Sequence, residues 1–200
     1  MKLEQMKIKK RLRTGFGFVT LLAMLSAVVG IIALIVVSTR YEYALSHYGF
    51  SQGDIGKAMI SFADMRSATR AGIGEDDTEL IEASVKEHDA QAEECSKNMK
   101  LIKECLSSKE EKAIYEKIET TMREYYTIEA EVLELGTTKD LSKSVQAQKM
   151  AAEKLDPAYD QVYDNMKDLL DLKEKEGNAL KSLLLKAINI AVIILIVVLI

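Results

Sequence analysis

Proline, tryptophan and cysteine are scarce in this sequence, which has one proline, no tryptophan and two cysteines in 200 residues. The chain also has no low-complexity tract and few of the apolar–polar alternations that are typical of strands. This composition argues against sheet-rich and disordered classes. Long helices remain, and we predict an all-α fold.

The two cysteines, Cys95 and Cys105, lie ten residues apart on one predicted helix. At about 1.5 Å per residue this spacing is about 15 Å, whereas a disulfide joins Cα atoms roughly 4.4–6.8 Å apart. A disulfide between the two is therefore excluded if the helix forms. Two interpretations stay open: both are small buried apolar residues, or one of them forms a disulfide with a second subunit.

Two long apolar runs lie towards the ends of the chain. The first, residues 14–37, has 24 residues without a charge, enough at about 1.5 Å per residue to cross a hydrocarbon core of roughly 30 Å. Because the apolar region of a signal peptide is only about 7–15 residues long, we predict an uncleaved transmembrane helix. The second, residues 183–200, has Lys186 near its start, where a long side chain can reach the interface. We expect a second transmembrane helix there, cut short at residue 200.

Charge is distributed unevenly along the chain, whose formal net charge is −4. Residues 1–13 hold six lysines or arginines and one acid, whereas residues 38–182 hold 20 basic and 30 acidic side chains, a net charge of −10. Lysine and arginine beside a membrane span stay in the cytoplasm. We therefore predict a two-pass inner (plasma) membrane protein with residues 1–13 in the cytoplasm and an extracytoplasmic domain at 38–182. A domain this acidic is not expected to bind nucleic acid.

Apolar residues between the two runs recur at alternating steps of three and four, which is the spacing of a heptad seam. Three short corners separate four such segments. The pattern predicts an antiparallel up-down-up-down four-helix bundle that is continuous with both transmembrane helices. The four seams cover residues 37–69, 81–106, 114–135 and 141–169, and the last slips by one residue near Leu172.

The corners carry helix-capping signals. We predict a left-handed glycine cap in the segment 72–74, a capping box that starts at Asp76, and a second capping box that starts at Ser107. The third corner is expected at residues 136–138.

Arg66 and Arg70 are the clearest candidate ligand contacts. Their spacing of four residues places both guanidiniums on one helix face, where they can hold a carboxylate in a bidentate way. The alternatives are that they pair with Asp64 or the acids of residues 75–77, or that they face solvent. Pro157 either kinks the last helix and exposes backbone groups, or opens a restarted helix.

Other polar and aromatic residues give weaker signals. His88 is predicted to be a packed core residue, and His47 lies far from it in sequence. Four tyrosines are expected to fill the core: Tyr125, Tyr126, Tyr159 and Tyr163. Four acids at helical spacing are expected to form a solvated face: Asp160, Asp164, Asp168 and Asp171. The sequence shows no nucleophile–base pair, metal-ligand spacing or glycine-rich phosphate loop, so we expect no enzyme, metal site or cofactor.

The basic start, the segment LRTGFGFV, the acidic helical domain and the second apolar run together resemble the amino-terminal half of a methyl-accepting chemotaxis protein with a four-helix-bundle ligand-binding domain. Two segments are similar to the aspartate-receptor type: residues 69–73 (TRAGI) and residues 156–159 (DPAY). The resemblance implies that Arg70 contacts a ligand carboxylate. The candidate ligand-binding residues are Arg66, Thr69, Arg70, Pro157, Ala158 and Tyr159.

The resemblance implies a homodimeric transmembrane chemoreceptor module. Such a module binds a small molecule or a binding protein outside the cell and transmits a helix shift through its second transmembrane helix. A cytoplasmic kinase and its adaptor would be reached only through a signalling part beyond residue 200. Two alternatives stay open: a sensor module of a histidine kinase or diguanylate cyclase, or a ligand-free helical scaffold tethered to the membrane.

Overall fold

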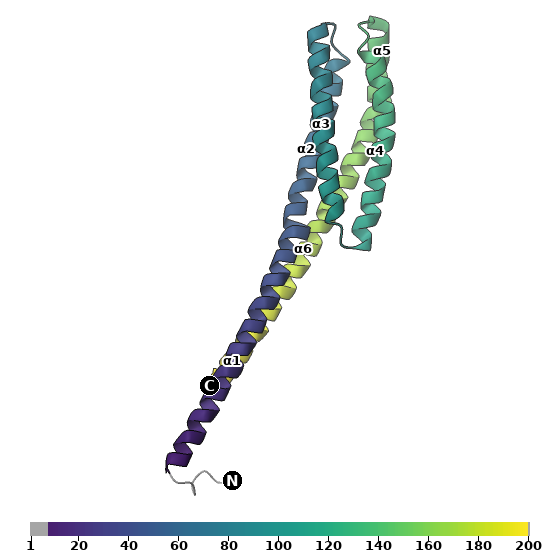
Figure 1. Cartoon of the computed structure of the whole chain (residues 1–200). Helices are drawn as coiled ribbons and strands as arrows, with labels where there is room; N and C mark the ends of the chain where they lie inside the picture. Colours follow the sequence, from purple (N-terminus) through teal and green to yellow (C-terminus); the bar gives the residue numbers. More distant parts are fainter. Residues whose placement is uncertain (1–7, 200) are drawn as a thin grey trace. The chain divides into compact units, whose positions relative to one another are not determined.

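Helices make up nearly all of this protein. The computed structural model describes residues 8–199 and, within that range, contains helices and short corners but no strand, which confirms the all-α prediction (Figure 1). The elements in chain order are α1 (Ile8–Ala44), the π-helical turn η2 (Leu45–Phe50), α2 (Ser51–Gly72), α3 (Thr78–Glu104), α4 (Lys109–Gly136), α5 (Leu141–Met150), the π-helical turn η3 (Ala151–Leu155) and α6 (Asp156–Leu199).

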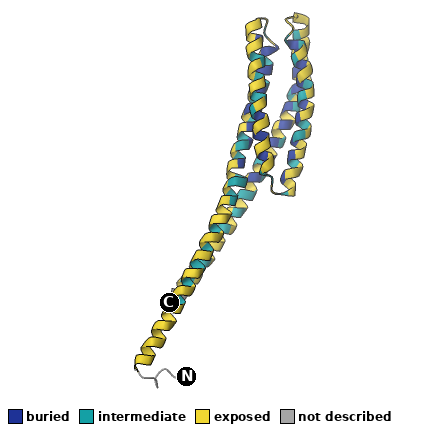
Figure 2. Ribbon diagram, viewed as in Figure 1, coloured by how far each residue is buried: buried dark blue, intermediate teal, exposed yellow. Residues whose placement is uncertain are grey.

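One of two compact units contains the apolar ends of the chain, Met1–Ala44 and Asn178–Ile200. Helix α1 buries none of its residues, and side chains such as Phe18 and Ile31 are more than half exposed (Figure 2). Two helical stretches, 65 and 57 residues long, each include a window that is long and apolar enough to cross a membrane, and no part of either window is buried. Apolar side chains that no protein covers suit a lipid environment.

The other unit, Leu45–Gly177, contains α2, α3, α4, α5 and the first part of α6. Its buried residues lie on the faces that the helices turn towards one another (Figure 2). The seam predicted for α2 is confirmed, since the structure buries Ser51, Ile55, Ala58, Phe62, Met65 and Thr69. The Ser144 hydroxyl donates to the carbonyl of Ile73 over 2.6 Å and thereby ties the start of α5 to the corner that follows α2.

The register of the last helix is set by η3. The predicted seam passed through Gln148 and Ala152, but the structure buries Ala147 and Ala151 instead. A π-helical turn inserts one extra residue into the helix. The seam therefore lies one residue earlier before η3 and agrees with the prediction from Leu155 onwards.

The slip predicted near Leu172 is wrong, because the core continues in register from Leu169 to the buried Lys173. A lysine at a core position disrupts the apolar pattern but not the helix. The true discontinuity lies just before Pro157, whose missing N–H leaves the carbonyl of Glu153 without its helical partner. The chain accommodates this proline with the π turn.

The seam predicted for helix α4 is confirmed only in part: Ile118, Tyr125 and Val132 are buried as predicted. The predicted seam also contained Ile114, Thr121, Ile128 and Leu135. The structure instead buries Tyr115, Met122, Glu129 and Gly136, each one residue further along. A search for regularly spaced apolar residues passes over Glu129 and Gly136. This explains why the prediction was one residue off at these positions.

Capping residues also lie one position from those predicted. Asp77, not Asp76, caps α3 and accepts a hydrogen bond from the amide of Glu79 over 2.8 Å. The capping box of α4 runs from Ser108 to Glu111, not from Ser107. The predicted left-handed glycine is also wrong. In the part of the chain that the structure describes, no glycine has a positive φ.

Candidate functional site

The two candidate arginines on α2 share one carboxylate from α6. Asp156 accepts from Arg66 through Nε at 3.1 Å and Nη2 at 2.8 Å, and its second oxygen accepts from Nη2 of Arg70. The arginine side chains are 35% and 33% exposed and that of Asp156 is 26% exposed. This exposure leaves the cluster open to solvent on one side.

Asp156 is the partner that sequence reasoning missed. The structure overturns the expected alternatives that Arg66 and Arg70 pair with Asp64 or with residues 75–77. Asp156 lies 86 residues from Arg70 in sequence, so no local pattern connects them. The available signal was its position directly before Pro157.

Aromatic rings pack against the arginine cluster. The Arg66 guanidinium lies 4.4 Å from the ring centroid of Tyr159, which is a cation–π contact. Tyr159 stacks on Phe62 at 5.0 Å and on Tyr163 at 5.7 Å between ring centroids. The contact with Tyr159 and the two hydrogen bonds to Asp156 together favour this position of Arg66.

The remaining predicted residues lie in different surroundings. Pro157 is exposed, and Ala158 packs against the core. Thr69 is fully buried and points to the bundle interior, where its hydroxyl reaches Glu129 Oε1 at 2.7 Å. The structure therefore brings together Arg66, Arg70 and Tyr159, and it separates Thr69 from them.

Glu129 is the centre of a polar group inside the bundle. One of its carboxylate oxygens accepts from Thr69 and, at 2.8 Å, from the Tyr125 hydroxyl, and the other lies 3.2 Å from His88 Nε2. The Glu129 carboxylate raises the pKa of His88, against the effect of burial, and Asp89 adds to the rise. Burial, with Glu129 beside it, raises the pKa of Tyr125. Thr69 and Tyr125 supply the hydrogen bonds that a buried carboxylate requires, and His88 is its charge partner when protonated.

The charges of the α2–α6 cluster determine what it can attract. Two guanidiniums and one carboxylate leave a formal charge of +1 within a strongly acidic domain. Burial opposes ionisation of Arg66, but the hydrogen-bonded Asp156 raises its pKa above the ordinary value. Arg66 and Arg70 are thus fixed cations that already hold a carboxylate. Among the residues that the structure describes, no group of three or more histidine, cysteine or acidic side chains is arranged so that it could hold a metal ion.

The described residues form a helical-bundle module with a partly exposed arginine cluster between α2 and α6. A family model described as the four helix bundle sensory module for signal transduction matches residues 5–182. The chain belongs to this family, the sensory module of methyl-accepting chemotaxis proteins. A search of the curated proteins finds no match to the chain.

Proposed function

We propose that this chain is the sensing half of a transmembrane chemoreceptor. Residues 1–13 lie in the cytoplasm, residues 14–37 and 183–200 cross the membrane, and residues 38–182 form an extracytoplasmic antiparallel bundle that acts as a homodimer. Family membership, the two apolar helices and the basic start support this arrangement.

The observation that carries the ligand proposal is the joint hold of Arg66 and Arg70 on Asp156. A carboxylate that two arginines already bind is the chemical equivalent of an amino-acid or organic-acid ligand. Asp156 then occupies the place of the ligand in the free receptor. A ligand carboxylate exchanges with it, drawn by the net positive charge of the cluster.

Transmission follows from the position of Asp156. It is the first residue of α6, directly after η3, and α6 continues into the second apolar run. Releasing Asp156 removes a tie between α2 and α6 beside a helical turn of unusual register. Receptor switches commonly use helix shifts of about 1–2 Å, and η3 offers a place where such a shift can begin.

The test is a binding screen of the full chain in lipid nanodiscs against amino acids and small organic acids, read by the thermal midpoint of the bundle. We expect one or more carboxylates to raise the midpoint of the parent protein and to lose this effect in Arg70→Ala. Asp156→Asn removes the competing carboxylate and should tighten binding. Lys97→Ala, on α3 in an exposed pair with Glu94, is the control and should behave as the parent.

Two outcomes contradict this ligand proposal. In one, no carboxylate raises the midpoint of the parent protein. In the other, a carboxylate stabilises the parent and Arg70→Ala equally.

A further inference from the structure

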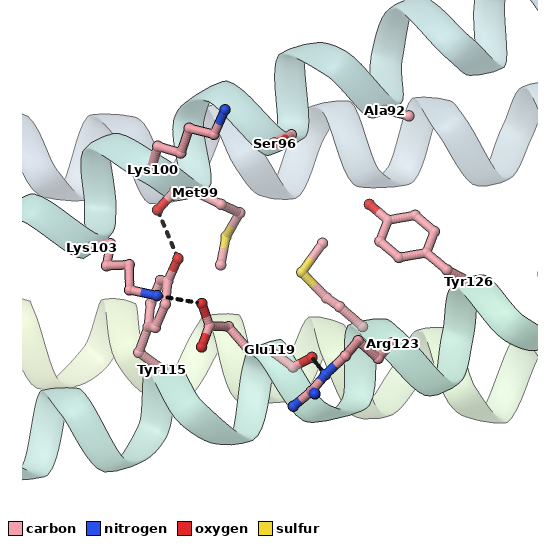
Figure 3. Close-up of a pocket in the computed structure, with 10 residues that line it drawn as sticks. Ala92, Ser96, Met99, Lys100, Lys103, Tyr115, Glu119, Arg123 and Tyr126 are labelled. Atoms are coloured by element: carbon pink, nitrogen blue, oxygen red, sulfur yellow. Dashed lines mark hydrogen bonds and ion pairs between the residues drawn. The ribbon is translucent and has the colours of Figure 1, made fainter.

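A second cationic hollow lies between α3 and α4, and its residues are not those of the α2–α6 cluster. This open groove has a volume of about 750 Å³. Figure 3 shows the residues that line it. Volumes of about 300–1,000 Å³ are typical of small-molecule sites. Its floor consists of the buried side chains Met99, Tyr115 and Met122, and Tyr126 projects its hydroxyl towards α3 (Figure 3).

Charge is concentrated on the rim of this groove. Three cations line it, Lys100, Lys103 and Arg123, against one acid, Glu119. The groove therefore carries a formal charge of +2 in a domain whose net charge is −10. A local excess of this sign is the complement of an anion.

The three cations make few hydrogen bonds or ion pairs with the rest of the protein. Lys103 pairs with Glu119 at 2.8 Å and lies 5.5 Å from the ring centroid of Tyr115. Arg123 donates from Nε to the backbone carbonyl of Glu119 at 3.1 Å. Within residues 8–199, neither the Nη groups of Arg123 nor Nζ of Lys100 has a hydrogen bond or an ion pair.

The apolar floor of the groove indicates which chemical group of a ligand can lie against it. Two thioethers and two tyrosine rings form an apolar, polarisable surface, and methionine sulfur makes favourable contacts with aromatic rings. A planar aromatic body can lie on this surface while its carboxylate meets the free guanidinium edge of Arg123 in a bidentate way.

We propose that the α3–α4 groove is a binding site for an aromatic carboxylate. The body lies against Met99 and Met122, and the carboxylate is held by Arg123 with Lys100 beside it. The site does not depend on the α2–α6 arginine cluster, so the receptor carries two separate places at which an organic anion acts.

The test uses 2-naphthoate as the probe and the full chain in nanodiscs with ¹³C-labelled methionine methyl groups. Resonances are assigned from Met99→Leu and Met122→Leu. Ring-current shifts should appear at these two methyl groups and not at Met65 or Met166, which lie in the bundle core. A local readout separates this site from partition of the probe into lipid.

Charge is tested on both sides of the contact. The neutral 2-naphthamide should shift the same resonances only at much higher concentration. Arg123→Gln should raise the dissociation constant for naphthoate roughly 1.5- to fivefold, the range expected for one exposed charge pair. The exposed Lys97→Gln on the same bundle should leave it unchanged, and Arg70→Gln should too.

Three results would overturn the proposal: no shift at Met99 or Met122, equal shifts with the amide, or unchanged affinity in Arg123→Gln. If binding instead disappears in Arg70→Gln and survives in Arg123→Gln, the anion occupies the α2–α6 cluster. That result would support the proposed receptor function and refute the groove.

Discussion

Replacing Lys173 by methionine tests the one fully buried ion pair in the described bundle. Lys173 Nζ lies 2.7 Å from Glu111 Oε1 and donates to the carbonyl of Cys105 at 2.7 Å, and both side chains are 0% exposed. Methionine fills a similar volume but leaves the Glu111 carboxylate without its cation. Removing one partner of a buried pair typically costs about 3–5 kcal/mol.

The expected loss is large enough to measure in the intact chain. The bundle unit has roughly 130 residues, for which about 1 kcal/mol corresponds to about 3–5 °C in Tm. Lys173→Met should therefore lower the thermal midpoint by about 10–20 °C, followed by circular dichroism at 222 nm in nanodiscs at pH 7. The double variant Lys173→Met/Glu111→Gln should recover most of this loss. In this variant the side-chain amide oxygen at position 111 can still accept from the backbone N–H of Ser108. Neither side chain of the former ion pair then carries a charge.

The pH dependence adds a second check, because the pKa of Glu111 reports on its cation. Burial opposes ionisation, but Lys173 and the amides of Ser107 and Ser108 lower the pKa of Glu111 in the parent protein. The parent gains stability from this residue above the unfolded pKa of about 4.3 and loses it as the pH falls through the lower folded pKa.

In Lys173→Met, burial acts without the cation and raises the pKa of Glu111, so protonation becomes stabilising. The deficit of the variant relative to the parent should therefore shrink as the pH falls from 7 to 5. A midpoint within about 3 °C of the parent, which is about 1 kcal/mol, would refute this reasoning. A double variant as unstable as the single one would refute it as well.

Two further predictions concern packing and thiol accessibility. Gly136→Ala would place a Cβ 2.4 Å from Cγ2 of Ile73, and this overlap should lower the free energy of unfolding by about 1–3 kcal/mol. Gly56→Ala is the matched control, because no atom lies within 4 Å of the added Cβ. It should raise the free energy of unfolding by about 0.5–1 kcal/mol. Denaturant titration checks both, and equal effects would contradict the packing argument. Burial raises the pKa of the Cys95 thiol to about 12, so maleimide at pH 8 should modify the partly exposed Cys105 first and reach Cys95 only as the bundle opens. Equal rates at the two thiols would show that Cys95 is accessible in the folded protein.

This burial also bears on the disulfide interpretations. Both thiols are free in the structure, and Cys95 is 0% exposed. A disulfide from Cys95 to another subunit would require the bundle to open. Cys105, only partly buried, is the cysteine that could form such a bond without disruption.

Local pattern was sufficient for the features that depend on neighbouring residues. Two long apolar runs, four heptad segments and their corners are properties of short windows, and the structure has helices in the described residues of both runs and in all four segments. The seam of α2 was correct residue by residue from Ser51 to Thr69, because its inward positions hold apolar or small side chains at regular spacing.

Only the tertiary structure decided the polar interior and the register. Glu129, Glu111 and Lys173 are buried because partners up to 68 residues away neutralise or hydrogen-bond them, and hydrophobic periodicity assigns such residues to the surface. The same limit hid Asp156. The spacing of Arg66 and Arg70 predicted a shared carboxylate, but the sequence alone could not show that α6 itself provides one, since that contact exists only when α2 and α6 pack together.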